Sequence, residues 1–318
     1  MSQIEINILK QGNQFKNVIS VSFFTMKNSY RPIEFYKQKL KNFMIRKKTL
    51  KGFETRIYTD NSGKDIALEL ADEDTTIIQY NCEFFREEDG HTGTFGTIVR
   101  FLPLFEKGLE TVWISDIDIH PSFLDTKVLS TMKSNKCDIF IDSALCYNRK
   151  PWTNVKYPII AHRFISNIIF PKQMFTRFLN NLIDGKMSTL IDEINEYNSP
   201  LKQPNSKFPY GMDEAFLNSS IYNSIHRHKL KILFRIDYFT QNFMVYNIER
   251  FPEKFTNILK RYYREPTQDL FKKVKDIYKE YTPMLLDKYP CMQDLIDKLP
   301  TFKNTFVTVN VIDSSVMV

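Results

Sequence analysis

The first 120 residues alternate between strand-like and helix-like segments, and this alternation constrains the fold more than any other feature of the chain. The strand-like runs are apolar and rich in β-branched residues, whereas the helix-like runs place apolar residues on one helical stripe. The expected strands are 17–26, 53–60, 75–83 and 111–119, and the expected helices are 32–48 and 93–108. This order predicts an α/β fold with a mostly parallel central sheet flanked by helices on both faces.

Beyond residue 120, strands and helices follow in a less regular order. The sequence predicts strands at 137–146, 229–239 and 304–312, strand-like sequence within 148–170, and helices at 171–197 and 212–228. Two further amphipathic helices are expected between residues 250 and 300. We therefore divide the chain into an α/β domain, 1–248, and a C-terminal helical extension, 249–318, packed on that domain.

Two aspartates, Asp116 and Asp118, follow the apolar run of the fourth predicted strand. Alternate strand residues point to the same side, so both carboxylates are expected to aim together. In an α/β sheet the ligand crevice lies beyond the carboxyl ends of the strands, where Asp60 also falls. Two converging carboxylates repel unless a cation or a proton lies between them. Oxygen ligands suit Mg²⁺ or Mn²⁺, which also hold substrate phosphates.

The charge and the cysteines narrow the classes of function. The net charge is +7, but lysines and arginines are spread along the chain and form no long basic tail. We interpret this as a solvated positive surface, or as suited to a phosphate-rich substrate. The four cysteines lie far apart without a Cys-x-x-Cys pair, so neither a zinc site nor a disulfide framework is expected.

The chain shows neither a signal-peptide pattern at its start nor an apolar run long enough for a membrane span. We therefore expect a soluble cytoplasmic protein without a membrane span. The oligomeric state is not indicated by the sequence.

Three classes of enzyme place Asp-x-Asp after an apolar strand. Phosphatases of the haloacid-dehalogenase type carry it near the N-terminus with Thr or Val two residues later, where this chain has His120. Nucleotidyltransferases of the poly(A)-polymerase type have Gly-Ser shortly before Ser-Asp-x-Asp; Ser115 to Asp118 fits, but no Gly-Ser precedes it.

The third class is the nucleotide-sugar glycosyltransferases of the GT-A fold, and several segments resemble its glycogenin-like members. GTFGTIVRFLPLFEKGLETVWISDIDI (93–119) is similar to their basic helix, turn, hydrophobic strand and Asp-x-Asp, with Arg100 placed 16 residues before Asp116. SVSFFTMKNSY (20–30) resembles their opening strand. YGMDE (210–214) resembles their Gly-x-Asp-Glu segment at the start of a helix. The similarity spans roughly residues 17 to 245.

The resemblance implies a GT-A fold and a metal-dependent transfer of a sugar from a nucleoside-diphosphate sugar, with UDP favoured, to a hydroxyl of a glycan or a protein. Asp116 and Asp118 would bind Mn²⁺ or Mg²⁺, and Asp237, which ends a later strand, is a candidate third ligand. The residues expected to contact the nucleotide or its phosphates are Thr25, Tyr30, Asp60, Arg100 and Asp116. Asp213 would act on the acceptor hydroxyl as a base or by orienting it, and Arg100 would help neutralise the leaving diphosphate.

The chain departs from the glycogenin-like pattern at its end. His-x-x-Gly-x-x-Lys-Pro-Trp, which supplies that family's third metal ligand and a phosphate-binding lysine, is missing. The nucleotidyltransferase and phosphatase readings of the same Asp pair therefore stay open. A basic α/β module that binds nucleic acid is the non-enzymatic alternative, although no nucleic-acid partner is expected because RNA-binding sequence motifs are missing.

Overall fold

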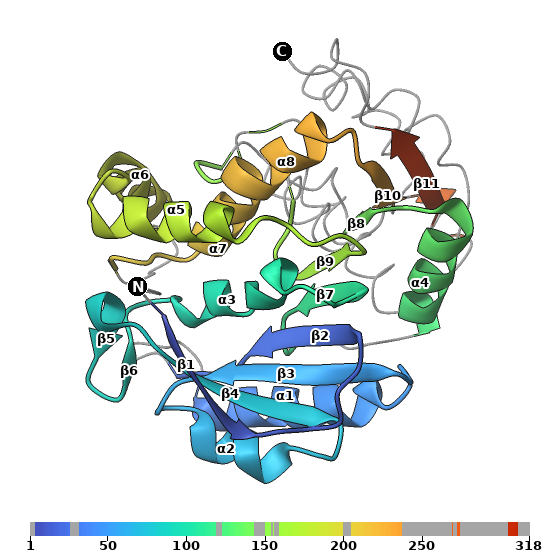
Figure 1. Cartoon of the computed structure of the whole chain (residues 1–318). Helices are drawn as coiled ribbons and strands as arrows, with labels where there is room; N and C mark the ends of the chain where they lie inside the picture. Colours follow the sequence, from blue (N-terminus) through green and yellow to red (C-terminus); the bar gives the residue numbers. More distant parts are fainter. Residues whose placement is uncertain are drawn as a thin grey trace.

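The computed structural model describes residues 4–25, 32–118, 123–142, 150–153, 155, 159–199, 205–236, 269, 272–273 and 305–310. These residues form an α/β fold around a nine-stranded mixed sheet (Figure 1). The strands of this sheet are β1 (Glu5–Lys10), β2 (Asn17–Ser22), β3 (Phe53–Thr59), β4 (Thr75–Asn81), β7 (Thr111–Ser115), β8 (Ile139–Asp142), β9 (Arg163–Ser166), β10 (Lys231–Ile236) and β11 (Thr305–Asn310). A separate hairpin consists of β5 (Arg86–Glu87) and β6 (Gly90–His91).

The sheet has the strand order β1-β4-β3-β2-β7-β9-β8-β10-β11. Strands β2, β3, β4 and β7 are mutually parallel, and β10 runs parallel to β8. Strand β9 lies antiparallel between β7 and β8, while β1 and β11 pair antiparallel with their neighbours. Six strands thus share one direction, which confirms the predicted mostly parallel sheet.

Helices cover both faces of the sheet. They are α1 (Ile33–Lys47), α2 (Lys64–Leu70), α3 (Gly96–Val99), α4 (Phe123–Asn135), α5 (Lys172–Ile183), α6 (Ser188–Asn198), α7 (Met212–Phe216) and α8 (Tyr222–Arg227). Short 3₁₀ turns lie at Glu83–Phe85 (η1) and Leu102–Phe105 (η2), and a π-helical turn, η5 (Leu217–Ile221), joins α7 to α8.

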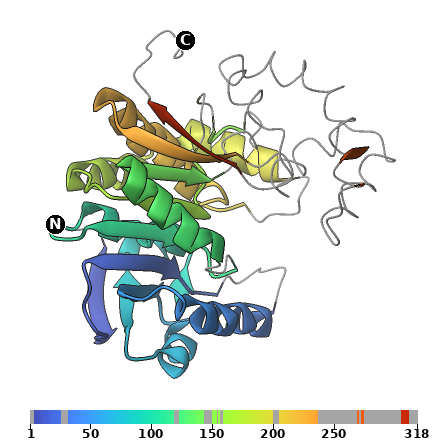
Figure 2. The ribbon, with the colours of Figure 1, turned by 90° about the vertical axis from the view of Figure 1, so that its right-hand side faces the viewer.

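Alternation along the strands divides the buried apolar residues into two clusters. In β7, Trp113 packs with α1, α2 and α4, whereas Val112 and Ile114 pack with α3, α5 and α7. In β8, Phe140 belongs to the same cluster as Trp113, and the residues on either side of Phe140 belong to the other cluster. Figure 1 shows α1 and α2 at one end of the molecule and α5 to α8 at the other, and Figure 2 shows α4 in front of the strands. The two-sided burial explains why these strands read as continuous apolar runs.

Several predicted elements differ in detail from the structure. The expected helix 93–108 is only a single turn, α3, followed by η2, because Pro103 cannot supply a backbone donor and enforces a break. The expected helix 171–197 divides into α5 and α6 at Gly185, whose φ of 72° ends α5. Strand β1 and helices α2 and α4 were not predicted.

The C-terminal part of the chain contributes a strand to the sheet. The expected strand 304–312 is present as β11, which pairs with β10. The predicted boundary at residue 248 and most of the two helices expected between 250 and 300 lie outside the described residues, so the division into two domains stays a prediction.

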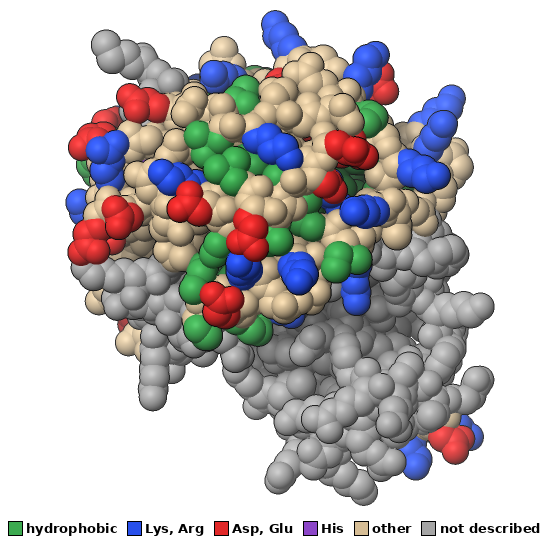
Figure 3. Space-filling view, turned by 90° about the horizontal axis from the view of Figure 1, so that it is seen from below, with side chains coloured by type: hydrophobic (Ala, Val, Ile, Leu, Met, Phe, Trp, Pro, Cys, Tyr) green, Lys and Arg blue, Asp and Glu red, His purple; other side chains and the backbone are tan. Residues whose placement is uncertain are grey.

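Charges of both signs share the surface. Figure 3 shows the molecule from below, where lysines and arginines alternate with acidic side chains over the part of that face that the structure describes. The excess of basic residues is therefore not gathered into one patch there. No helix among the described residues is long and apolar enough to cross a membrane. Cys82 and Cys137 are both buried, and the other two cysteines lie outside the described residues.

The helix segment that follows Gly211 is anchored in the core by Phe216. This ring is fully buried and contacts the rings of Phe101, Phe105, Phe175 and Phe178 at centroid distances of 5.1 to 6.1 Å. We expect Phe216→Ala to lower the free energy of unfolding by about 3–5 kcal/mol, because it leaves a cavity among these rings. Chemical denaturation measures this change.

Phe35→Ala is the matched control, because Phe35 is 38% exposed on α1. This variant should lower the free energy of unfolding by only about 0.5 kcal/mol. Equal losses for the two variants would contradict the described packing of α7.

Candidate functional site

The strand order makes the carboxyl ends of β2 and β7 the place where a ligand crevice is expected. From β2 the chain adds β3 and then β4 on one side, and later adds β7 on the other side of β2. Ligands of open α/β sheets bind at such a reversal of strand order. Thr25 follows β2 and Asp116 follows β7, so both lie where a ligand is expected.

Strand β9 brings a second segment to the same edge. Because β9 runs antiparallel to β7, with Ser115 opposite Arg163, the residues before β9 lie at the carboxyl end of β7. The backbone N–H of Asp116 donates to the carbonyl of His162 over 3.3 Å. The segment 159–162 thereby forms one wall of the crevice.

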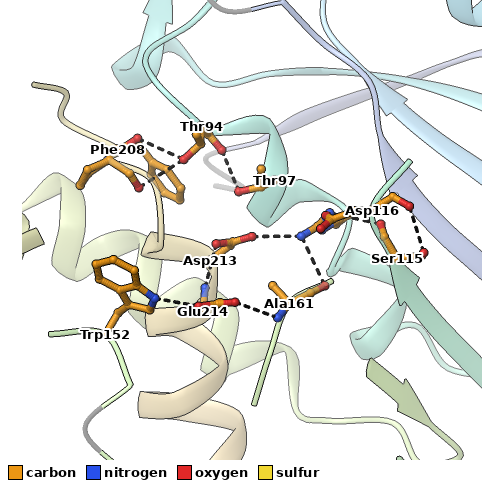
Figure 4. Close-up of polar contacts among 11 residues, drawn as sticks. Thr94, Thr97, Ser115, Asp116, Trp152, Ala161, Phe208, Asp213 and Glu214 are labelled. Carbon is orange, nitrogen blue, oxygen red and sulfur yellow. Dashed lines mark hydrogen bonds and ion pairs between the residues drawn. The ribbon is translucent and has the colours of Figure 1, made fainter. Parts of the chain in front are cut away.

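Arg100 connects three parts of the chain at this edge. Its guanidinium pairs with Asp116 through Nη1 and with Asp213 Oδ2 through Nη2 at 3.0 Å (Figure 4). The same group donates to the carbonyls of Ser115 at 3.2 Å and Ala161 at 3.4 Å. Arg100 is only 3% exposed. It therefore holds Asp116 and Asp213 in place as a buried group that is almost inaccessible to a ligand.

The backbone of Arg100 is fixed as well. The hydroxyl of Ser20, buried in β2, donates to the Arg100 carbonyl at 2.6 Å. Strand β2 thus anchors the end of α3, and the side chain that leaves this point reaches both carboxylates.

Helix α7 delivers Asp213 and Glu214 from its first turn, as the sequence predicts. The turn begins after Gly211, which has a φ of 101°. A Cβ at that position would lie 2.6 Å from the ring of Trp152, so the close approach of Trp152 and the positive φ both require glycine.

Glu214 accepts its hydrogen bonds on the side of the site away from Asp116. Its carboxylate accepts a hydrogen bond from Trp152 Nε1 at 2.7 Å and one from the backbone N–H of Ala161 at 3.4 Å (Figure 4). The ammonium group of Lys150 lies 5.2 Å from the centroid of the Trp152 ring. Burial and then the charge of Asp213 raise the pKa of Glu214 to about 7.

Negative charge is in excess at this site. One guanidinium, that of Arg100, serves the carboxylates of Asp116 and Asp213, while Asp118 and Glu214 lie beside them. The pKa of Asp213 is raised by burial, against the effect of Arg100. The pKa of Asp118 is raised by desolvation and by the charge of Asp116. Because Asp118 still contacts solvent, we attribute its shift mainly to that charge.

A divalent cation fits this charge distribution. It would relieve the repulsion between Asp116 and Asp118, and carboxylate oxygens are ligands that Mg²⁺ and Mn²⁺ accept. Within the described ranges, no group of three or more His, Cys, Asp or Glu side chains is arranged to hold a metal. The pair would therefore need ligands from a substrate, from water or from residues that are not described.

The structure places the remaining predicted residues as follows. The backbone N–H of Thr25 donates to Ser62 Oγ at 2.9 Å, and its half-buried side chain stands at the end of β2. Asp60 is only 1% exposed and accepts the backbone N–H of Ser62 at 3.0 Å. This burial favours a supporting place for the carboxylate, and the predicted contact of Asp60 with a nucleotide stays a prediction. Tyr30, His120 and Asp237 lie outside the described residues.

Sequence reasoning missed both the position of residues 159–162 beside the end of β7 and the hydrogen bond from Trp152 to Glu214. It assumed parallel strands, for which only residues after a strand reach the crevice, whereas β9 presents the residues before it. His162, directly before the strand-like run, was a signal for this wall. Trp152 was visible only as a lone aromatic residue in a loop.

Comparisons of the chain with protein families, with curated proteins and with solved structures found no match. The function must therefore be argued from the geometry and the chemistry of this crevice.

Replacing Arg100 tests whether it balances the two carboxylates. Arg100→Met should lower the free energy of unfolding by about 3–5 kcal/mol, because it leaves Asp213 buried without its cation. Adding Asp213→Asn should recover part of this loss, since the uncompensated charge disappears. Denaturant titration of the single and double variants measures the coupling, and Arg177→Met on the exposed face of α5 is the control. Additive losses would contradict a shared ion pair.

The raised pKa of Glu214 predicts a specific dependence of stability on pH. An unfolded glutamate titrates near 4.5 and the folded one near 7, so the folded state binds more protons between these values. Stability should therefore fall as pH rises from about 4.5 to 7 and then level off, by on the order of 3 kcal/mol. Glu214→Gln should remove this part of the pH dependence in metal-free protein. If the free energies of unfolding of wild type and variant differ by the same amount at every pH in this range, the raised pKa of Glu214 is refuted.

Proposed function

We propose that this protein is a metal-dependent glycosyltransferase of the GT-A type that transfers a sugar from a nucleoside-diphosphate sugar to a hydroxyl group. The observation that carries the proposal is the meeting of Asp116, Arg100 and Asp213 in one ion-pair network, although Asp213 lies 113 residues beyond Arg100 in the chain. These residues belong to the separate segments whose order and spacing resemble that class. Their position at the reversal of strand order adds independent support.

Asp118 and Asp116 are the residues that would hold Mn²⁺ or Mg²⁺. When bound, the ion supplies positive charge that stabilises the departing diphosphate. Arg100 keeps Asp116 in place and adds its charge from beneath the carboxylate, which replaces the direct phosphate contact expected from the sequence. Thr25 follows β2, where a nucleotide would run between the ends of β2 and β7.

Asp213 and Glu214 would serve the acceptor side of the same crevice. Asp213 is held by Arg100 and by the backbone N–H of Glu214, which leaves its position fixed for orienting an acceptor hydroxyl. Glu214 has a pKa near neutrality, which suits a group that exchanges protons at working pH. A UDP-sugar donor and a glycan or protein acceptor are parts of this proposal.

Calorimetry with UDP tests the donor half of the proposal. Wild-type protein should bind UDP in the presence of Mn²⁺ and lose most of that affinity when the ion is chelated. Asp118→Ala should abolish the dependence on Mn²⁺, because it removes the carboxylate expected to ligate the ion. Asp184→Ala, an exposed aspartate after α5 that pairs with Lys186, is the control and should behave like wild type.

The alternative functions predict other results when the same purified protein is assayed. Hydrolysis of a generic phosphate ester without affinity for sugar nucleotides would favour a phosphatase. Incorporation of nucleotide into a primer would favour a nucleotidyltransferase. Salt-sensitive binding of RNA that is indifferent to Asp116 and Asp118 would favour a nucleic-acid-binding module.

A further inference from the structure

Asp60 forms a buried pair with His91, a residue of the small hairpin. His91 Nδ1 is 3.0 Å from Asp60 Oδ2, and both side chains are almost fully enclosed, with exposures of 4% and 1%. His91 comes from the small hairpin at β6, whereas Asp60 follows β3. The pair thus connects the hairpin to the carboxyl edge of the sheet.

The backbone fixes which nitrogen of His91 carries the proton. The N–H of Cys82 donates to His91 Nε2 at 3.0 Å, so Nε2 must be an acceptor. The proton of the neutral ring is then on Nδ1, which donates to Asp60. The ring cannot turn away, because it stacks on Phe95 with centroids 5.3 Å apart and packs against Tyr80 at 4.9 Å.

Through Ser62, Asp60 connects His91 to the segment that follows β2. Its Oδ1 accepts the hydroxyl of Ser62 at 2.5 Å and the Ser62 backbone N–H at 3.0 Å. A serine hydroxyl has one proton, so Ser62 Oγ can only accept from Thr25, whose backbone N–H lies 2.9 Å away. Every bond from Cys82 to Thr25 therefore has one possible direction.

The turn that carries Ser62 is pressed against β2. A Cβ at Gly63 would lie 2.6 Å from the carbonyl oxygen of Phe23, which shows how closely the turn and the strand end approach. The hydroxyl of Thr25 makes no hydrogen bond with any residue that the structure describes, and its side chain is only half-buried. The chain of hydrogen bonds thus fixes the backbone of Thr25 and leaves its hydroxyl available to a ligand.

We propose that His91 is a positioning residue for nucleotide binding, acting through Asp60 and Ser62 on Thr25. This inference rests on the proposed function, because it assumes that a nucleotide occupies the crevice. His91 does not touch the metal pair Asp116 and Asp118. Its loss should therefore weaken nucleotide binding and leave the binding of the metal alone unchanged.

The test compares His91→Leu with His91→Asn. Leucine fills the space but cannot donate to Asp60, whereas asparagine can place an amide N–H where Nδ1 lies. Calorimetry with UDP and Mn²⁺ should show affinity reduced about tenfold or more for His91→Leu, in line with the effect of losing an outer-shell partner. His91→Asn should keep most of the affinity. Mn²⁺ titrated without UDP should bind all three proteins equally.

Ser62→Ala supplies a second, independent variant in the same chain of bonds. It should weaken UDP binding as His91→Leu does, and the double variant should be no weaker than the worse single variant. The inference is overturned if His91→Leu binds UDP like wild type, if it loses Mn²⁺ and UDP binding together, or if the two losses add. If wild-type protein shows no Mn²⁺-dependent binding of UDP, the proposed function fails first and the inference fails with it.

Discussion

The ion pairs of Arg100 with Asp116 and Asp213 are the interaction on which the candidate site of this protein depends. A buried guanidinium is costly unless it is paired, and this one is paired with both carboxylates and with two backbone carbonyls. It thereby links α3, the end of β7 and the start of α7. Because one cation serves several carboxylates, the edge retains negative charge, and a divalent ion is the natural complement.

The fold was largely predictable because burial on both faces makes the central strands continuous apolar runs. The elements that were missed lack such a signal. Strand β1 is an exposed edge strand whose Ile6 and Ile8 are 45% and 54% exposed, so its pattern is set by pairing and not by burial. Helix α3 was predicted too long because periodicity says nothing of a break that Pro103 imposes. The antiparallel direction of β9 depends on contacts distant in sequence, which no local pattern encodes.

The residues of the candidate site also fall into those that the sequence indicates and those that only the structure reveals. Asp116, Arg100 and Asp213 could be predicted because each belongs to a short segment with recognisable order and spacing. Asp60 follows a strand as predicted, but its burial, which favours a supporting role, could not be predicted because position along a strand does not report burial. His91 carried no sequence signal at all, since a tripeptide around a lone histidine cannot reveal that it meets Asp60 in space. Positions of supporting residues thus require the three-dimensional structure.

The most direct test of this account is a crystal structure of the protein soaked with Mn²⁺ and UDP, with anomalous scattering used to locate the metal. The account predicts one strong Mn²⁺ peak at coordination distance from Asp118 and close to Asp116, with the diphosphate between the ends of β2 and β7. A Mn²⁺ peak elsewhere, or UDP bound away from that edge while Asp116 and Asp118 contact only solvent, would contradict it.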